Sequence, residues 1–369
     1  MVSNNKILNI EVLRGLAALL VAIYHLSVVN GVQLVGDRMD FIRKWMMHGW
    51  IGVPLFFVIS GVVISLNLWN ASHQNLSTAT FAKSRFLRIA PLHYLTLLIA
   101  ALFFTNWSNH YAYSSLIMQL LFLQNLDPHA AQSAFNGPSW SVALEMQFYV
   151  LAALVVVPLT KYSTQKIAWG SIAITLLWKF LLMQYWGDVP STQGEQAGRI
   201  VGLSNMLPGV ICDFAFGFLI ARNLLFQGTG AELIRKYALP GLLLSVLLLW
   251  LYVEAMAYVN TQYYKGKDAS MLWVYVFSTV PLGGIFALLV ASVCFLGNSP
   301  SRLNPLVYLG TISYGIYLWH WVAITLLMKV LKIGWIFNLL VLTITICLSS
   351  ISWHFFEKPI LKLKTSLMR

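Results

Sequence analysis

Residues 7–26 read ILNIEVLRGLAALLVAIYHL, an apolar run interrupted by Glu11, Arg14 and His25. A helix needs about 20 mostly apolar residues to cross the hydrocarbon core of a bilayer, so this run is long enough to span one. Residues 50–69, WIGVPLFFVISGVVISLNLW, form a second run with no charged side chain. Because Arg14 interrupts the first run and no small-residue cleavage site follows it, we expect a retained transmembrane helix rather than a cleaved signal peptide.

The same pattern continues along the whole chain. Of its 369 residues, 59% are hydrophobic and 10% are charged, and the mean hydropathy is +0.73, whereas soluble domains carry about 25% charged residues. Apolar runs occur at about 10–29, 50–69, 89–106, 139–159, 167–186, 206–226, 238–258, 271–296, 305–329 and 334–357. We therefore predict an all-α integral membrane protein, a bundle of about ten transmembrane helices. We expect residues 1–369 to form a single transmembrane domain with no separate soluble domain.

The formal net charge of +12 predicts an orientation in the membrane rather than nucleic-acid binding. Apart from Arg14 and Lys179, the basic residues lie between the apolar runs or at their ends, not in a patch on a soluble domain. If the N-terminus is cytoplasmic, 14 basic residues fall on the inner side and 8 on the outer side. Because basic residues favour the cytoplasmic side, we expect a multi-pass protein in contact with membrane lipid, with both termini in the cytoplasm.

The cysteines indicate neither a disulfide framework nor a metal site. Cys212, Cys294 and Cys347 all fall within apolar runs, where they are most simply small hydrophobic residues. We therefore expect no metal. No oligomeric state follows from the residues.

The connection at residues 107–138 contains no lysine or arginine and is rich in aromatic and amide side chains, such as Trp107, Tyr111, Gln124 and Asn136. Such a segment either lies in the membrane interface or dips back into the protein. A long, polar-tipped outer loop suits a site for an acceptor substrate. An interfacial belt that only anchors the helices explains the composition equally well.

Ionisable residues inside transmembrane segments are costly and commonly functional. Arg14 and His25 are 11 positions apart, which on a helix is about three turns and about 16 Å, so they share one face. This face connects the inner boundary of the membrane with its outer third. In the alternative interpretation, Glu11 pairs with Arg14 at the membrane edge and His25 bonds to a neighbouring carbonyl.

Two further arginines precede the third apolar run. Arg85 and Arg88 are three positions apart, so on a helix they point the same way. Guanidinium groups match phosphate oxygens, which indicates a phosphate clamp. An ordinary positive-inside anchor is the simpler explanation of the same residues.

Glu145 and His320 complete the set of candidate residues. By the predicted topology, Glu145 lies about one and a half turns below the outer surface, near the depth of His25. His320 lies just inside the outer half, somewhat deeper. If their helices are neighbours, two histidines and one carboxylate converge. A neutral imidazole oriented by such a group acts as a general base toward a hydroxyl, although a transporter's proton relay uses the same residue types.

Other notable residues receive no chemical role. The second apolar run contains the small residues Gly52, Ser60 and Gly61, which in such a span more often permit close helix packing than bind a ligand. Lys179 and Asp213 lie in or near apolar runs, and the sequence suggests no role for them.

Six segments together resemble the acyltransferase 3 family of integral membrane acyltransferases, and the resemblance covers nearly the whole chain. They are LRGLAALLVAIYH (13–25), GVPLFFVISGVVI (52–64), RFLRIAPLHYL (85–95), PSWSVALEMQFYVL (138–151), ISYGIYLWH (312–320) and FFEKPI (355–360). The sequence departs from the commonest pattern of the second segment at Pro54, where an acidic residue is frequent. Any role of that acidic side chain is therefore absent here. We also expect no appended esterase-like domain, which some relatives carry.

The resemblance implies an O-acetyltransferase of the bacterial cytoplasmic (inner) membrane. Its donor is expected to be cytoplasmic acetyl-CoA. Its acceptor is expected to be a hydroxyl of a surface or lipid-linked glycan, such as lipopolysaccharide O-antigen or exopolysaccharide. Carried over by matching motif, Arg14, Arg85 and Arg88 serve the donor end and His25 serves catalysis. Glu145 matches a family motif, and Glu145 or His320 would orient His25 or take part in proton removal. A proton-coupled transporter or glycan flippase is the alternative function, and a structural scaffold is a third class.

Overall fold

The computed structural model describes residues 4–29, 40–73, 78–127, 130, 135–186, 194–226, 228–264, 270–296, 301 and 304–366. Within these ranges all regular structure is helical and there is no strand. Nine of the described helices are long and apolar enough to cross a membrane. The prediction of an all-α membrane protein is therefore confirmed.

The described helices fall into three consecutive groups along the chain. The first group is α1 (Asn4–Val29), α2 (Asp40–Met47), α3 (Gly52–His73), α4 (Thr78–Phe103), α5 (Ala112–Leu120) and α7 (Trp140–Leu159). The second group is α8 (Thr164–Trp186), α9 (Gly194–Ser204), α10 (Leu207–Phe226), α11 (Thr229–Lys236), α12 (Ala238–Tyr264) and α13 (Met271–Phe295). The last group is α14 (Pro305–Thr311), α15 (Ser313–Leu327), α16 (Trp335–Ser352), the π-helical turn Trp353–Glu357 and α17 (Lys358–Ser366).

The predicted run 305–329 is not one continuous helix. It is divided into α14 and α15 at Ile312, whose backbone angles (φ −95°, ψ 7°) leave the helical region. Irregular backbone at membrane depth is tolerated where protein surrounds it, and Ile312 and Ser313 are 1% and 0% exposed. This interruption explains why nine long helices are found where about ten were predicted.

Two other segments also differ from the sequence expectation. Helix α4 begins at Thr78, 11 residues before the apolar run at 89, so Arg85 and Arg88 are both helical. Arginine is a good helix former, and its charge ends an apolar run without ending the helix. In the described part of the connection 107–138, α5 is followed by the 3₁₀ turn Gln124–Leu126, and Gln119 and Gln124 are fully buried. These buried glutamines show that the described part of the connection packs into the protein and is not only a surface belt.

The chain divides into two compact units, each assembled from distant segments. Unit 1 comprises residues 1–13, 53–70 and 154–304, and unit 2 comprises residues 14–52, 71–153 and 305–369. In unit 1, α10 contacts α8 and α13, and α12 packs on α13. A Cβ atom on Gly61 would lie 2.2 Å from the carbonyl oxygen of Phe214, so this small residue permits close packing of α3 on α10, as expected from the sequence.

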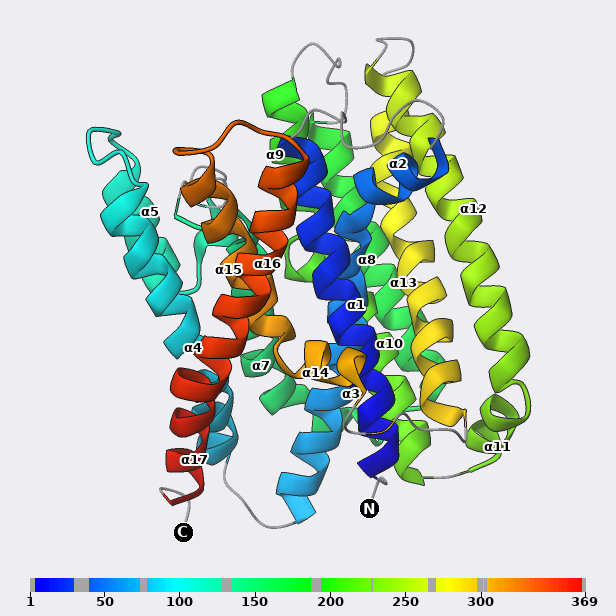
Figure 1. Ribbon diagram of the computed structural model, residues 1–369. Coiled ribbons are helices and arrows are strands. Elements are labelled where there is room, and N and C mark those ends of the chain that lie inside the picture. The colour runs from blue at the N-terminus through cyan, green and yellow to red at the C-terminus, as the bar shows by residue number, and fades with distance from the viewer. Residues whose placement is uncertain are drawn as a thin grey trace. The chain divides into compact units, whose positions relative to one another are not determined.

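Unit 2 contains all six residues singled out as the candidate site. In this unit α15 packs on α16 and on α4, and α17 also contacts α4. Figure 1 shows these C-terminal helices, coloured orange to red, beside α4, coloured cyan. Segments more than 200 residues apart in the sequence therefore build one unit around α15.

Candidate functional site

The structure brings His25 of α1 and His320 of α15 into direct contact. His320 Nε2 lies 3.2 Å from His25 Nδ1, and the ring centroids are 5.0 Å apart. His320 is completely buried, whereas His25 keeps some exposed surface. The two residues are 295 positions apart in the sequence, so only the fold of unit 2 places them together.

Hydrogen bonds to backbone carbonyls assign the tautomers of this pair. A carbonyl oxygen only accepts, so His320 Nδ1, 3.1 Å from the oxygen of Ile316, carries a proton and its Nε2 has the lone pair. His25 Nδ1 lies 2.9 Å from the oxygen of Val21 and therefore carries a proton as well. The same N–H faces His320 Nε2. In the neutral ring, the basic nitrogen of His25 is therefore Nε2.

The basic nitrogen of His25 is available for chemistry. Within the described ranges of the chain, no hydrogen-bond partner is found for Nε2 of His25. The indole of Trp321 stands edge-on to the His25 ring, with centroids 5.4 Å apart. On the other side of the pair, Tyr317 lies against His320, with centroids 6.0 Å apart. An imidazole with one nitrogen held by acceptors and the other free is the arrangement required of a general base.

Glu145 is in contact with a tyrosine that lies near the arginines. Tyr149, one turn further along α7, donates a hydrogen bond of 2.5 Å to Glu145 Oε1. The hydroxyl of Tyr149 also lies within the electrostatic reach of Arg14 and Arg85. The buried phenol of Tyr149 thus contacts Glu145 and experiences the charges of both arginines.

This position differs from the depth expected from the sequence. Ser141, near the start of α7, lies 2.6 Å from the hydroxyl of Tyr317, one turn before His320 on α15. Tyr317 also donates to the carbonyl of Pro138. Helix α7 therefore begins near the level of Tyr317, and the residues just before it, Pro138 and Ser139, are already buried in the unit. Glu145 lies a turn deeper than Ser141, whereas we expected it at the level of His25.

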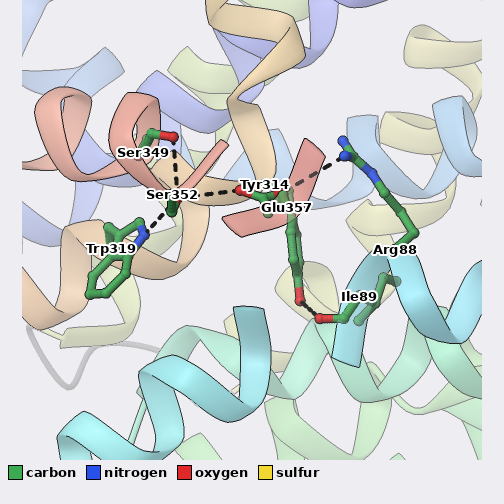
Figure 2. A network of polar contacts seen from close by, with 7 residues as sticks. All are labelled: Arg88, Ile89, Tyr314, Trp319, Ser349, Ser352 and Glu357. Atoms are coloured by element: carbon green, nitrogen blue, oxygen red, sulfur yellow. Dashed lines mark hydrogen bonds and ion pairs between the residues drawn. The ribbon is translucent and has the colours of Figure 1, made fainter. Parts of the chain in front are cut away.

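Arg88 is engaged by a polar network that joins α4 to α15 and α16. Its Nη1 lies 3.7 Å from Glu357 Oε2, and its guanidinium lies 5.0 Å from the ring centroid of Trp353. Ser352 donates to Glu357 Oε1 at 3.3 Å and accepts a 3.1 Å hydrogen bond from the indole of Trp319. Figure 2 shows this chain of contacts running from Trp319 through Ser352 and Glu357 to Arg88.

A π-helical turn presents Glu357 to Arg88. The turn spans Trp353–Glu357 and is followed by Lys358 and Pro359. Proline has no N–H to donate to the carbonyl four residues earlier and clashes with it, which favours such a local widening. π-Helical turns are frequent at functional sites. Beside it, Tyr314 donates a 2.8 Å hydrogen bond to the carbonyl of Ile89, which fixes α4 against α15 (Figure 2).

Arg85 has different surroundings from Arg88. Its guanidinium lies 5.4 Å from the ring centroid of Phe81. Its Nε atom is buried and finds no hydrogen-bond partner within the described part of the chain. An unpaired buried donor costs about 1–3 kcal/mol. A phosphate oxygen is the acceptor that guanidinium groups match best, so the residue fits a phosphorylated ligand.

The sequence reasoning assigned no role to Glu357, Tyr149 or Trp319, although all three lie within the quoted motifs. Glu357 offered a signal, because it is a carboxylate at the end of an apolar run and ionisable groups in such runs are functional candidates. Tyr149 and Trp319 offered none, since aromatic residues are abundant in the chain. Their hydrogen bonds appear only when the helices are packed.

Fold and site together define a class of protein: a multi-pass helical membrane protein in which two histidines of distant helices are in contact and arginines lie in the same unit. The family model described as an acyltransferase domain matches residues 7–354, and the chain belongs to this family. No solved structure matches the chain.

Three curated relatives illustrate the similarity. The putative peptidoglycan O-acetyltransferase YrhL of Bacillus subtilis (strain 168) is 29% identical over 373 residues, covering 94% of this chain and 54% of the relative. The peptidoglycan O-acetyltransferase OatA of Listeria monocytogenes is 25% identical over 400 residues, covering 98% and 56%. The acyltransferase MdmB of Streptomyces mycarofaciens is 28% identical over 323 residues, covering 85% and 77%. The chain thus spans about half the length of the first two relatives.

Proposed function

We propose that this protein is an O-acetyltransferase that moves an acetyl group from cytoplasmic acetyl-CoA to a hydroxyl of a surface or lipid-linked glycan. We place it in the bacterial cytoplasmic membrane with both termini in the cytoplasm, as the distribution of basic residues favours. Membership of the acyltransferase family and the names of two relatives as peptidoglycan O-acetyltransferases support the reaction class.

The observation that carries the proposal is the tautomer of the histidine pair, which leaves the lone pair of His25 Nε2 available. His25 Nε2 removes the proton of the acceptor hydroxyl, and the hydroxyl oxygen attacks the thioester carbonyl carbon. A C–O bond forms and the C–S bond breaks. The imidazolium returns the proton to the departing thiolate, so that free CoA leaves as a thiol. His320 stabilises the imidazolium by accepting the Nδ1–H.

The donor end of the site is the region of the unit that contains Arg14, Arg85 and Arg88. Arg14 lies on the same continuous helix as His25, about three turns and about 16 Å away. The buried, unpaired Nε of Arg85 supports an anionic ligand at this end. An extended pantetheine arm spans such a separation, so direct transfer needs no additional carrier. We assign Glu145 to the donor end as well. Tyr149, which donates a hydrogen bond to Glu145, lies within the electrostatic reach of Arg14 and Arg85.

The acceptor is proposed to be a glycan, approached from the side of the segment 107–138. The resemblance favours lipopolysaccharide O-antigen or exopolysaccharide, whereas the names of two relatives mention peptidoglycan. Comparison of the cell-surface glycans of cells with and without the protein by mass spectrometry identifies the acceptor. A gain of one acetyl unit on a repeating sugar or on peptidoglycan is expected, and it distinguishes these sources.

Transfer of radiolabelled acetyl from acetyl-CoA to a glycan extract, catalysed by the purified protein, tests the reaction. His25→Ala is expected to abolish most of the transfer. His110→Ala is the matched control, because His110 is exposed and lies outside the histidine pair. Transfer by the parent protein that is unaffected by His25→Ala would rule out His25 as the base. No transfer by the parent protein would favour a proton-coupled transporter or a flippase.

A further inference from the structure

Arg85 and Arg88 differ in whether their positive charge is already paired with a carboxylate. Arg85 and Arg88 are three positions apart on α4, so they lie on the same side of the helix. Arg88 is paired with Glu357, and its guanidinium also lies over the Trp353 ring. For Arg85 no carboxylate partner is found within the described ranges, and its Nε is buried without an acceptor.

Separation of Glu357 from the Arg88 guanidinium would strongly destabilise the protein. Its side chain is 5% exposed. One carboxylate oxygen faces Arg88, and the other accepts from Ser352, which is held in turn by Trp319 (Figure 2). Removing one partner of a buried ion pair leaves an uncompensated charge and is strongly destabilising, whereas replacing both partners is often neutral. A ligand that drew Arg88 away from Glu357 would leave such a charge.

The pair also determines where Arg85 points. The contacts of Arg88 with Glu357, and of Ile89 with Tyr314, hold α4 in one rotation against α15 and the π-helical turn. Since Arg85 lies one turn earlier on the same helix, this rotation fixes the face of α4 from which its side chain projects. A cationic group that is already held in place before the ligand binds loses less conformational entropy on binding.

We infer that Arg85 is the phosphate-binding residue of the donor site and that Arg88 and Glu357 form a structural ion pair that positions Arg85. The inference rests on the proposed function in that the phosphate is taken to be that of CoA. The spacing of Arg85 and Arg88 alone suggests that both bind phosphate. The inference assigns phosphate binding to Arg85 and a structural role to Arg88. The ligand chemistry is a phosphate ester or diphosphate.

Binding of CoA to the purified full chain, measured together with its melting temperature, tests the inference through charge-neutral replacements. Arg85→Gln is expected to raise the Kd for CoA by about tenfold, as for the loss of one charge-assisted contact, with no loss in melting temperature. The control Lys83→Gln removes an exposed cation from the same helix and is expected to change the Kd by less than about twofold.

The second arm uses Arg88→Gln, Glu357→Gln and the double variant. Each single variant is expected to lower the melting temperature, and the double variant is expected to recover most of the loss and to bind CoA within about threefold of the parent. If the single variants do not fold, comparison of the double variant with the parent still decides. A double variant that is stable but binds CoA as weakly as Arg85→Gln would overturn the inference, because Arg88 would then be a phosphate ligand.

The outcomes separate this inference from the proposed function. If the parent protein binds CoA but Arg85→Gln binds it equally well, the assignment of Arg85 is wrong and the donor proposal stands. If the parent protein does not bind CoA, the donor proposal fails together with the assignment of Arg85. In that case, the recovery of stability in the double variant still decides whether the ion pair is structural.

Discussion

Replacement of His320 by alanine is expected to slow acetyl transfer without abolishing it. In this variant, His25 keeps the hydrogen bond from Nδ1 to the Val21 carbonyl at 2.9 Å, so the ring keeps its tautomer. It loses the contact of 3.2 Å with His320 Nε2, which accepts the N–H of the imidazolium. A hydrogen bond to a charged group contributes about 1.5–3 kcal/mol. The expected fall in kcat is therefore about 10- to 150-fold.

Replacement of His25 by alanine is expected to have a larger effect. General base catalysis contributes about 10²- to 10⁴-fold, and no other group in the pair replaces His25 Nε2. His320→Gln is the matched variant, because a glutamine carbonyl oxygen is able to accept the His25 Nδ1–H in place of His320 Nε2. It is expected to restore part of the loss seen in His320→Ala.

Initial rates of radiolabelled acetyl transfer at saturating acetyl-CoA measure these effects. The KM for the donor is expected to change little in the His320 variants, because the arginines lie elsewhere in the unit. If His320→Ala reduced kcat as much as His25→Ala or more, His320 would be the base and the tautomer assignment would be refuted. Equal rates for His320→Ala and the parent would show that the contact has no catalytic role.

Two further predictions concern stability, measured as the melting temperature of the purified protein. Gly15→Ala is expected to destabilise the protein by about 1–3 kcal/mol through overpacking, because the added Cβ atom would lie 2.8 Å from the backbone nitrogen of Gly310. Gly170→Ala, where nothing lies within 4 Å, is the control and is expected to cause no loss. Lys179→Met is expected to cost about 3–5 kcal/mol, because Lys179 is fully buried and lies in the electrostatic reach of the buried Asp213. Adding Asp213→Asn is expected to recover much of that loss, and a double variant no more stable than Lys179→Met would show that the two charges do not compensate each other.

The positions of most helices were predictable because the signal is local. The predicted runs 139–159 and 271–296 agree within one residue with α7 (Trp140–Leu159) and α13 (Met271–Phe295). The start of α4 was missed because charged side chains end an apolar run although the helix continues through them. The break at Ile312 was missed because irregular backbone is tolerated there only by the surrounding protein, which the sequence of one run does not reveal.

The candidate residues were also recognised locally, since ionisable groups in apolar segments are rare and costly. Their partners were not predictable in the same way. The expected level of Glu145 assumed that α7 starts at the membrane surface, but its preceding segment already returns into unit 2. The division between Arg85 and Arg88 depends on Glu357, which lies 269 positions after Arg88 in the chain.

The amino-acid sequence by itself determined that this protein is a helical membrane protein of the acyltransferase family, and it singled out the histidines and arginines. These properties depend on the solvation of each segment and on local motifs, which are present in the unfolded chain. Only the tertiary structure decided that His25 meets His320 and that Arg88 meets Glu357. Contacts between helices distant in sequence depend on how side chains pack and satisfy one another's hydrogen bonds, and no single segment carries that information.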